Sequence, residues 1–344
     1  MMTRQQALDV FASDDLIGIG MAADALRRKL HPEGVVTYII DRNINYTNFC
    51  TEYCSFCAFY RPLGHPEGYI LPKETIFQKI QETIDLGGTG ILMQGGLHPD
   101  LKIGWYEDLL SSIKRRFPAV HLHCFSAPEV LNIAEVSGLT LGDTIARLRD
   151  AGLGSIPGGG AEILDDEVRH RISRLKCNTQ EWIDVHRTAH SLGMRTTATM
   201  MFGCGETVEQ RVNHLEAVRR IQEETGGFTA FIPWTFQREN TSLGSFVKEE
   251  ATAVEYLKAL AISRLYLENV LNVQSSWVTQ GLKTCQIGLR FGGNDVGSIM
   301  IEENVVAAAG AHHRSTEEEL RRIIRDAGFI PKQRDTLYRT YFLN

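Results

Sequence analysis

Short β-rich runs alternate with longer stretches of helical periodicity along the chain, and this alternation restricts the fold more than any other feature of the sequence. The runs are VVTYII (35–40), GILMQ (90–94), AVHLHCF (119–125), LGSIP (153–157), RTTATMMF (195–202), FTAFIPW (228–234), LNVQSSW (271–277) and QIGLRF (286–291). Between them, segments such as KETIFQKIQETIDLGG carry apolar residues at intervals of three and four. Eight such β/α units without a Pro/Ser-rich linker predict an α/β fold, a (βα)8 TIM-type barrel over residues 35–344, preceded by a helical extension over residues 1–34.

The expected helix boundaries agree with this interpretation. Gly87 and Gly88 end one helix, Pro118 follows another, and Thr207 to Gln210 form a capping box at the start of the helix after the fifth run. A doubly wound sheet is the alternative fold. Because catalytic groups of a barrel lie at the carboxyl ends of its strands, the loops after the β-rich runs should carry the chemistry.

Composition excludes some classes of protein and favours a compartment. A chain of 344 residues with 43% hydrophobic content can form one barrel-sized core. A net charge of -6 argues against a nucleic-acid partner. No apolar run is long enough to span a membrane, and the first residues lack the pattern of a signal peptide, so we expect no membrane partner. An odd number of cysteines, seven, fits a reducing compartment, and the sequence predicts a cytoplasmic protein.

Three cysteines stand close together in the stretch NFCTEYCSFCAFYR, in the loop expected after the first run. Cys50, Cys54 and Cys57 have the spacing C-x3-C-x2-C. Disulfides need an even number and a structural zinc site needs four ligands, so three thiolates predict a metal centre with one position left open. A zinc site completed by His65 is the alternative. A [4Fe-4S] cluster held by three thiolates, with one iron free, explains the spacing better.

The pattern C-x3-C-x-aromatic-C, with Phe56 as the aromatic residue, resembles the signature of the radical S-adenosylmethionine superfamily. The resemblance implies that S-adenosylmethionine binds the free iron and that an electron from the cluster cleaves it to methionine and a 5'-deoxyadenosyl radical. It also implies a small-molecule substrate and a low-potential electron donor such as flavodoxin or ferredoxin. By the same resemblance, Phe56 packs beside the adenine.

Two further strand ends match the superfamily's contacts to S-adenosylmethionine. Gln94, Gly95 and Gly96 resemble the segment that contacts the methionine amino group, although many members have GGE where this chain has QGG. The stretch PGGGAE resembles the segment that contacts the ribose and methionine parts, which implies cofactor-binding roles for Gly158, Gly159 and Glu162. Glycine allows such a close approach because it has no Cβ atom. A plain turn is the alternative for the second segment.

Motifs spread over the chain narrow the resemblance to the menaquinone branch, which is related to the deazaflavin cofactor synthases. They are INYTNFCTEYCSFCAFYR, MQGGLHPD, GGGAEI, FIPWTFQRENT and RFGGNDVGS. The tract IPWTFQ resembles the members that cyclise dehypoxanthine futalosine. For them the implied reaction begins when the radical takes hydrogen from C4' of the sugar. The sugar radical then closes a ring onto the benzoate-bearing part, and S-adenosylmethionine is consumed. A sister activity, which joins an adenosyl group to an enolpyruvyl benzoate, and a radical enzyme like the deazaflavin synthases are the alternatives.

Candidates for catalysis come from the strand ends. His121 and His123 share one face of a strand, and His123 lies nearer the carboxyl end, which makes it a candidate proton acceptor. His98 and Asp295 are further catalytic candidates. Groups suited to the substrate's carboxylate, hydroxyls and ring are expected at Trp234, Gln274, Ser276, Arg290, Asn294 and Asp295.

Two other classes of protein stay open at this point. RFGGNDVGS lies where many barrels bind phosphate, which would suit a phosphate-binding barrel with an incidental zinc site. A non-catalytic iron-sulfur protein is the other. The remaining cysteines, Cys124, Cys177, Cys204 and Cys285, share no metal-binding spacing and are interpreted as small apolar residues of the core.

Overall fold

The computed structural model describes residues 1–339 and 341–342 of the chain. Its helices are α1 (Arg4–Ala12), α2 (Leu16–Leu30), α3 (Lys73–Asp85), α4 (Ile103–Arg116), α5 (Ala127–Ser137), α6 (Leu141–Ala151), α7 (Asp166–Ile172), α8 (Thr179–Ser191), α9 (Val208–Thr225), the 3-10 turn η1 (Leu243–Ser245), α10 (Ala253–Tyr266), α11 (Gly281–Gly288), α12 (Val305–Ala308) and α13 (Glu317–Asp326). Its strands are β1 (Val35–Ile39), β2 (Asn43–Ile44), β3 (Gly90–Met93), β4 (His121–Cys124), β5 (Ser155–Ile156), β6 (Arg195–Phe202), β7 (Phe228–Thr235), β8 (Asn272–Val273), β9 (Asp295–Ser298), β10 (Ile330–Arg334) and β11 (Tyr341–Phe342).

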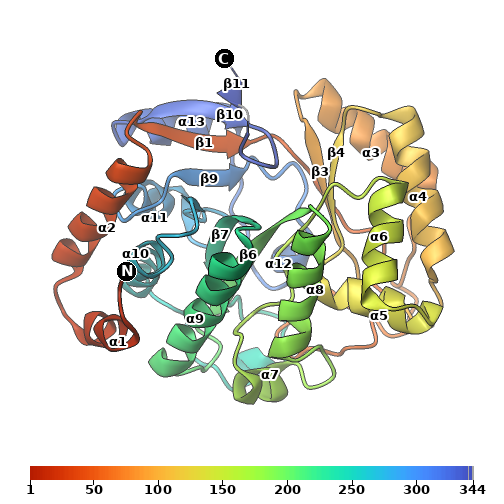
Figure 1. The fold of residues 1–344 in the computed structure, drawn as a ribbon, viewed down its shortest axis with the longest axis horizontal. Helices are drawn as coiled ribbons and strands as arrows, with labels where there is room; N and C mark the ends of the chain where they lie inside the picture. Colours follow the sequence, from red (N-terminus) through yellow and green to blue (C-terminus); the bar gives the residue numbers. More distant parts are fainter. Residues whose placement is uncertain (340, 343–344) are drawn as a thin grey trace.

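The strands form a curved parallel wall with helices outside it. A seven-stranded sheet has the order β2-β3-β4-β5-β6-β7-β8, with every neighbouring pair parallel. Helices α3, α4, α6, α8 and α9 lie outside strands β3 to β7 (Figure 1). Parallel strands that are covered by their crossover helices form the architecture predicted from the sequence, so the (βα)8 barrel is confirmed and the doubly wound sheet is not.

The wall continues from β8 back to β1 through a second sheet. A parallel bridge joins Gln274 after β8 to Asp295 in β9, and β9 pairs with β1. The C-terminal strand β10 pairs in parallel with the other edge of β1. The Gln333 side chain donates a hydrogen bond from Nε2 to the Gly87 carbonyl just before β3. The C-terminal segment therefore lies between the first and second strands of the barrel.

One predicted strand is wrong. Residues 286–291 were expected to form the eighth strand, but α11 covers Gly281–Gly288 and β9 begins only at Asp295. A short apolar run does not distinguish a buried strand from one face of a short helix. Here Cys285 and Leu289 are buried in a small core with Trp277 and Phe329, so they serve as the buried face of a helix.

Helices α1 and α2 lie in the first 34 residues, which were expected to be helical. The capping box predicted at Thr207 is also present at the start of α9. α2 packs against α10, and α1 packs against α9 and α10. Ala7, Phe11, Ile19 and Ala23 enter the same core as the barrel. The boundary at residue 34 stays a prediction.

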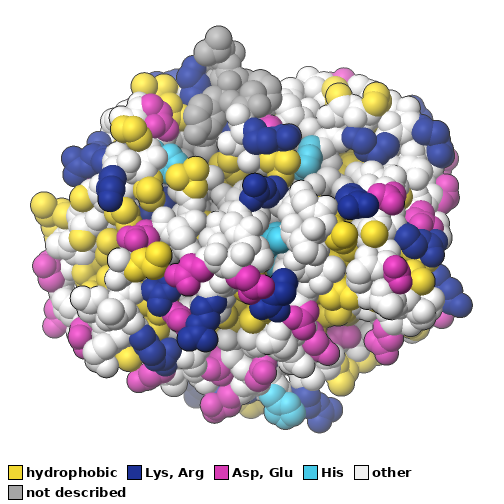
Figure 2. Space-filling model, viewed as in Figure 1, with side chains coloured by type: hydrophobic (Ala, Val, Ile, Leu, Met, Phe, Trp, Pro, Cys, Tyr) yellow, Lys and Arg dark blue, Asp and Glu magenta, His cyan; other side chains and the backbone are white. Residues whose placement is uncertain are grey.

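The face of the molecule in Figure 2 carries acidic and basic side chains interspersed, with apolar side chains scattered among them. Among the described residues, no helix is both long and apolar enough to cross a membrane.

Candidate active site

The three cysteines of the C-x3-C-x2-C stretch lie in the long loop between β2 and α3, which we call the cysteine loop (residues 48–61). Backbone hydrogen bonds fix this loop at both ends and in its middle. Cys50 N–H donates to the Arg61 carbonyl, and Arg61 N–H donates to the Asn48 carbonyl, at 3.1 and 2.7 Å. In the middle, Ser55 N–H donates to the Ile172 carbonyl at the end of α7, at 2.9 Å. The loop is therefore anchored to the rim of the barrel at the carboxyl ends of its strands.

The environment of the thiols fits a metal cluster. Cys54 is buried, whereas Cys50 and Cys57 are half-buried. Burial raises the pKa of the Cys50 and Cys54 thiols, Lys176 opposes that rise at both, and Cys57 adds to it. Buried thiolates need a compensating positive charge, which iron ions provide when they bind. The donor set and its burial therefore suit a cluster held by three cysteines.

A single-ion site is not what the loop provides. Among the residues that the structure describes, no group of three or more His, Cys, Asp or Glu side chains is arranged to hold one metal ion. His65 is in no such group, and its Nδ1 accepts the Glu67 N–H at 3.2 Å. In a cubane each thiolate binds a different iron, so its three sulfurs lie farther apart than the ligands of one ion. The described residues therefore do not form the zinc site with His65, and a cluster does not need the close ligand spacing of a single ion.

Gly95 and Gly96 follow β3, and Gly96 lies directly against the cysteine loop. A Cβ atom on Gly96 would lie 2.1 Å from the Phe49 carbonyl oxygen and 2.8 Å from Cys50 Cβ. On Gly95 it would lie 2.7 Å from the Tyr46 ring. Both residues are only partly buried. Gly96 is therefore required by the packing of the cysteine loop and Gly95 by the packing of the segment before it, and their predicted contact with the cofactor stays a prediction.

A half-buried lysine connects the cysteine loop to the glycine-rich segment after β5. Lys176 Nζ lies 5.3 Å from the centre of the Phe56 ring and 3.1 Å from Glu162 Oε1. Burial lowers the pKa of Lys176, but the Glu162 carboxylate together with Cys54 and Cys177 outweighs burial and raises it above its ordinary value. Arg169 lies 3.8 Å from Glu162 Oε2. Sequence reasoning missed Lys176, for which the spacing of motifs gives no signal.

Glu162 has an unusual backbone and an unsatisfied oxygen. Its φ of 39° lies in the left-handed region, which non-glycine residues seldom adopt. The residue is 5% exposed, and its Oε2 has no hydrogen-bond partner. Buried polar atoms are normally paired, so this oxygen indicates a missing donor. Such a strained, unsatisfied carboxylate suits the cofactor-binding role predicted for it.

The glycine segment itself is held by β6. Gly158 N–H donates to Thr197 Oγ1 at 2.9 Å, and Thr199 Oγ1 donates to the Gly158 carbonyl at 2.8 Å. A Cβ atom on Gly158 would lie 2.6 Å from the Thr197 carbonyl oxygen. At Gly159 a Cβ atom would lie 2.6 Å from Gln94 Nε2, so this glycine and the predicted Gln94 face each other. The segment is a packed part of the barrel wall, more than a plain turn.

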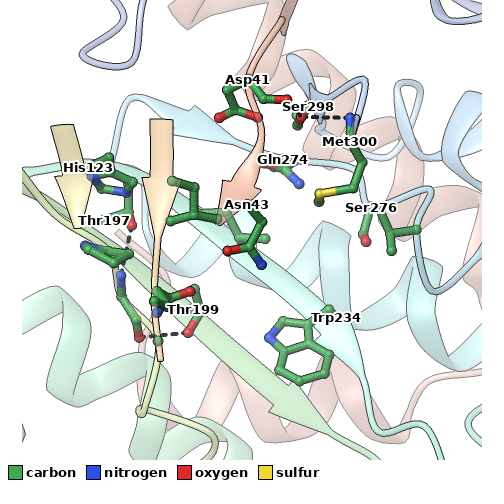
Figure 3. A pocket seen from close by; sticks show the side chains of 18 of the residues that line it. Asp41, Asn43, His123, Thr197, Thr199, Trp234, Gln274, Ser276, Ser298 and Met300 are labelled. Carbon is green, nitrogen blue, oxygen red and sulfur yellow. Dashed lines mark hydrogen bonds between the residues drawn. The ribbon is translucent and has the colours of Figure 1, made fainter. Parts of the chain in front are cut away.

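A central cavity of about 310 Å³ opens inside the barrel. Four of the predicted cofactor-binding residues line it, namely Gln94, Gly158, Gly159 and Glu162. Trp234, Gln274 and Ser276, expected to face the substrate, line it as well and project from neighbouring strands in Figure 3. Its volume suits a small-molecule ligand.

His123 lies in the wall of this cavity, and its hydrogen bond explains its orientation. The Ser155 hydroxyl lies 2.6 Å from His123 Nδ1 and 2.7 Å from His121 Nε2, which confirms that the two histidines share a face. Burial, with smaller contributions from His121 and Arg334, lowers the pKa of His123 to about 3. The ring is therefore neutral near pH 7 and weakly basic, so it suits hydrogen bonding better than proton removal.

The other two catalytic candidates are placed differently. Asp295 is fully buried, and its oxygens bond Arg334 Nε and Nη2 at 2.6 and 3.0 Å, the Thr37 hydroxyl at 2.5 Å and the Gly297 N–H at 2.8 Å. With its acceptor positions occupied, Asp295 positions Arg334. His98 does not line the cavity; its Nδ1 accepts the Asp100 N–H and its ring packs edge-on against Phe49.

Arg290 and Asn294, expected near the substrate, also lie outside the cavity. Arg290 packs over the Phe329 ring, and Asn294 Oδ1 accepts a hydrogen bond from Arg264 Nη2 at 2.6 Å. Their misplacement follows from the wrong eighth strand, because the true strand starts at Asp295.

Several residues of the cavity escaped sequence reasoning. Asp41 and Asn43 follow β1 and line the cavity with Ile39. Ile39, Asp41 and Asn43 are two residues apart, so the alternation of the first β-rich run predicts that they share a face. Arg334, Thr336 and Tyr338 line it from the C-terminal segment. No local sequence pattern predicts that this segment pairs with β1.

Comparison with known protein families gives two matches. Residues 44–218 match the family described as the radical SAM superfamily, and residues 225–343 match the one described as the CofH/MqnC C-terminal region. The chain is 51% identical to the cyclic dehypoxanthine futalosine synthase of Halalkalibacterium halodurans, over 98% of this chain and 90% of that protein. It is 44% identical to the protein of the same name from Streptomyces coelicolor, over 98% and 85%.

A differently named relative is almost as similar as the second of these. The 5-amino-6-(D-ribitylamino)uracil–L-tyrosine 4-hydroxyphenyl transferase of Methanothermobacter thermautotrophicus is 43% identical, over 98% of this chain and 94% of that protein. Among solved structures, methylornithine synthase (PylB) aligns with a TM-score of 0.74 at 17% identity, over 96% of this chain and 94% of that one. The hydrogenase maturase HydG aligns with a TM-score of 0.76 at 14% identity, over 98% and 73%. These two likenesses concern the fold.

Proposed function

Because the chain belongs to the radical S-adenosylmethionine superfamily, and within it to the CofH/MqnC group, we propose that it cyclises dehypoxanthine futalosine to cyclic dehypoxanthinyl futalosine in menaquinone synthesis. The proposal places hydrogen abstraction at C4' of the sugar and ring closure in the central cavity. Two comparisons support it. The chain is 51% identical to a protein named for this reaction, and it has the IPWTFQ tract, whose Ile232 and Trp234 line the cavity.

One observation carries the proposal. The cysteine loop and the cavity are joined by direct contacts, from the Phe56 ring through Lys176 to Glu162 in the cavity wall. A ligand held beside the three thiols can therefore extend into the cavity. This is the arrangement that a reaction between S-adenosylmethionine and a second small molecule needs.

Cys50, Cys54 and Cys57 would hold the [4Fe-4S] cluster, which would supply the electron that cleaves S-adenosylmethionine to the 5'-deoxyadenosyl radical. The chain's own residues have the remaining tasks. Gln94, Gly158, Gly159 and Glu162 form the wall against which S-adenosylmethionine is held. Gly96 fixes the cysteine loop at Phe49 and Cys50, and Phe56 packs beside the adenine.

The cavity also protects the reaction. Ile232 and Trp234 of β7, with Val278, Val305 and Val306, give one side of it an apolar surface. Such a surface suits the ring of the substrate and excludes water from a radical. His123, neutral and bonded to Ser155, offers a hydrogen bond whose direction depends on its tautomer.

The electron donor and the compartment are part of the same proposal. A low-potential donor such as flavodoxin or ferredoxin would reduce the cluster. A reducing compartment such as the cytoplasm agrees with seven cysteines that are all free thiols.

Incubation of the reduced, reconstituted protein with three substrate sets tests the proposal. Dehypoxanthine futalosine should give a product lighter by two hydrogens, together with 5'-deoxyadenosine. An adenosyl adduct from an enolpyruvyl benzoate would instead identify the sister activity. A product from tyrosine and 5-amino-6-(D-ribitylamino)uracil would identify the activity for which the archaeal relatives are named. Either of these results, without cyclisation, refutes the proposal.

A further inference from the structure

Three buried polar atoms in the wall of the central cavity have no hydrogen-bond partner. They are Asn43 Oδ1, Thr336 Oγ1 and Glu162 Oε2, and their residues are 6%, 8% and 5% exposed. Leaving a buried donor or acceptor unsatisfied costs about 1–3 kcal/mol, so folded proteins pair nearly all of them. Three such atoms around one cavity indicate that a polar ligand supplies the partners.

Two of the three belong to a region distinct from the predicted cofactor wall. Asn43 is the first residue of β2, just after β1, and Thr336 comes from the C-terminal segment that pairs with β1. Asp41 precedes Asn43 by two residues, so the two side chains share a face, and both line the cavity (Figure 3). Glu162 comes from the loop after β5.

The side chains of Asp41, Asn43 and Thr336 determine which chemical group of a ligand can bind beside them. An amide oxygen, a carboxylate and a hydroxyl are suited to neighbouring hydroxyl groups, which donate and accept hydrogen bonds. A carboxylate ligand is unsuited, because Asp41 is acidic and the nearby cation, Arg334, already forms a two-bond ion pair with Asp295. Ile232 and Trp234 face the cavity with apolar side chains, which are less suited to hydroxyls.

We propose that Asp41, Asn43 and Thr336 form a hydroxyl-binding subsite that holds the sugar of the substrate in the central cavity. The inference rests on the proposed function and adds to it the residues that recognise the sugar. Asn43 Oδ1 and the Asp41 carboxylate accept hydrogen bonds from sugar hydroxyls, and Thr336 adds a third partner when its hydroxyl, which lies against Gly90, turns toward the cavity. Holding the sugar at two or more points fixes which of its hydrogens faces the S-adenosylmethionine side of the cavity.

Binding measurements with Asn43→Ala test the subsite. Isothermal titration of dehypoxanthine futalosine into the reconstituted protein should give about tenfold weaker binding for the variant, whereas S-adenosylmethionine should bind as in the wild type. Asn269→Ala is the matched control, because its Oδ1 is also buried without a partner but the residue does not line the cavity. It should bind substrate with unchanged affinity.

Two analogues of dehypoxanthine futalosine, one without the 2' hydroxyl and one without the 3' hydroxyl, test whether Asn43 binds a sugar hydroxyl. The wild type should bind at least one of them several-fold more weakly than the substrate, and Asn43→Ala should lose that discrimination. Asp41→Asn, which keeps the shape, provides a second variant if Asn43→Ala does not fold.

The outcomes separate the two proposals. A wild type that neither binds nor cyclises dehypoxanthine futalosine refutes the proposed function. A wild type that cyclises it, with unchanged substrate affinity in Asn43→Ala or Asp41→Asn, refutes the subsite alone. Retained discrimination between substrate and both analogues in the variants would likewise overturn it.

Discussion

Replacement of Gly96 by alanine should disable the cysteine loop while the barrel stays folded. The added Cβ would lie 2.1 Å from the Phe49 carbonyl oxygen and 2.8 Å from Cys50 Cβ. The first of these is a backbone atom, which cannot rotate away as a side chain could. Gly96 is also fixed from its other side, because its N–H donates to the Thr47 carbonyl at 3.0 Å. Relief of the clash therefore requires movement of the loop at Cys50.

The magnitude follows from these contacts. Overpacking of a well-packed region costs about 1–3 kcal/mol, which lowers the melting temperature of a large domain by several degrees. The effect on the cluster should be larger than on the fold, since the displaced backbone carries one of the three ligands. We expect the iron content after anaerobic reconstitution to fall to less than about half that of the wild type, because a metal site tolerates only small errors in ligand position.

Gly142→Ala is the matched control. Gly142 lies in α6, where an added Cβ would meet no atom within 4 Å. Alanine in a helix is favoured over glycine by up to about 1 kcal/mol, so this variant should be slightly more stable and bind iron normally. Wild-type iron content and melting temperature in Gly96→Ala would refute the argument that the close approach at Gly96 shapes the loop.

Three other variants probe the site. Alanine in place of any one cysteine of the loop should abolish iron binding and activity, whereas Cys177→Ala should keep both; full iron in a loop variant would show that the ligands are wrongly assigned. Glu162→Gln should weaken S-adenosylmethionine binding several-fold in a titration and keep the iron, since a charged hydrogen bond is replaced by a neutral one; unchanged affinity would remove Glu162 from the cofactor site. Burial raises the pKa of Asp41 to about 6, with Arg334 opposing and Asp295 adding to the rise. Protonation below about pH 6 should therefore lower kcat/KM about fivefold in the wild type and leave Asp41→Asn flat; equal pH profiles would contradict this.

The barrel was predictable because most of its strands carry a local signal. RTTATMMF became β6 with the same bounds, since β-branched residues and buried methionines leave little ambiguity. The prediction of the eighth strand was wrong because the true strand, DVGS from Asp295 to Ser298, is short and lacks apolar alternation. The preceding QIGLRF has that alternation. The neighbouring strands β1 and β8, and not its own composition, make this segment a strand.

The residues of the site were likewise predictable only where a local sequence pattern marks them. The cysteines, Gln94 and the glycine segment were found because a motif fixes their spacing. Lys176 was not, because it reaches Glu162 from a separate loop. Thr336 and Tyr338 approach the cavity from the far end of the chain. Such contacts depend on tertiary packing between segments distant in sequence, which periodicity does not encode. Asp41 and Asn43 were readable, as the period-two continuation of the first run, once the strand was extended past Ile40.

The most direct test of the account follows a hydrogen atom. Dehypoxanthine futalosine that carries deuterium at C4' of the sugar would be incubated with the reduced protein and S-adenosylmethionine, and both products analysed by mass spectrometry. The account predicts that 5'-deoxyadenosine gains one deuterium and that the cyclised product has lost it. Cyclised product that keeps its deuterium, or 5'-deoxyadenosine that gains none while cyclisation proceeds, would contradict abstraction at C4' in this cavity.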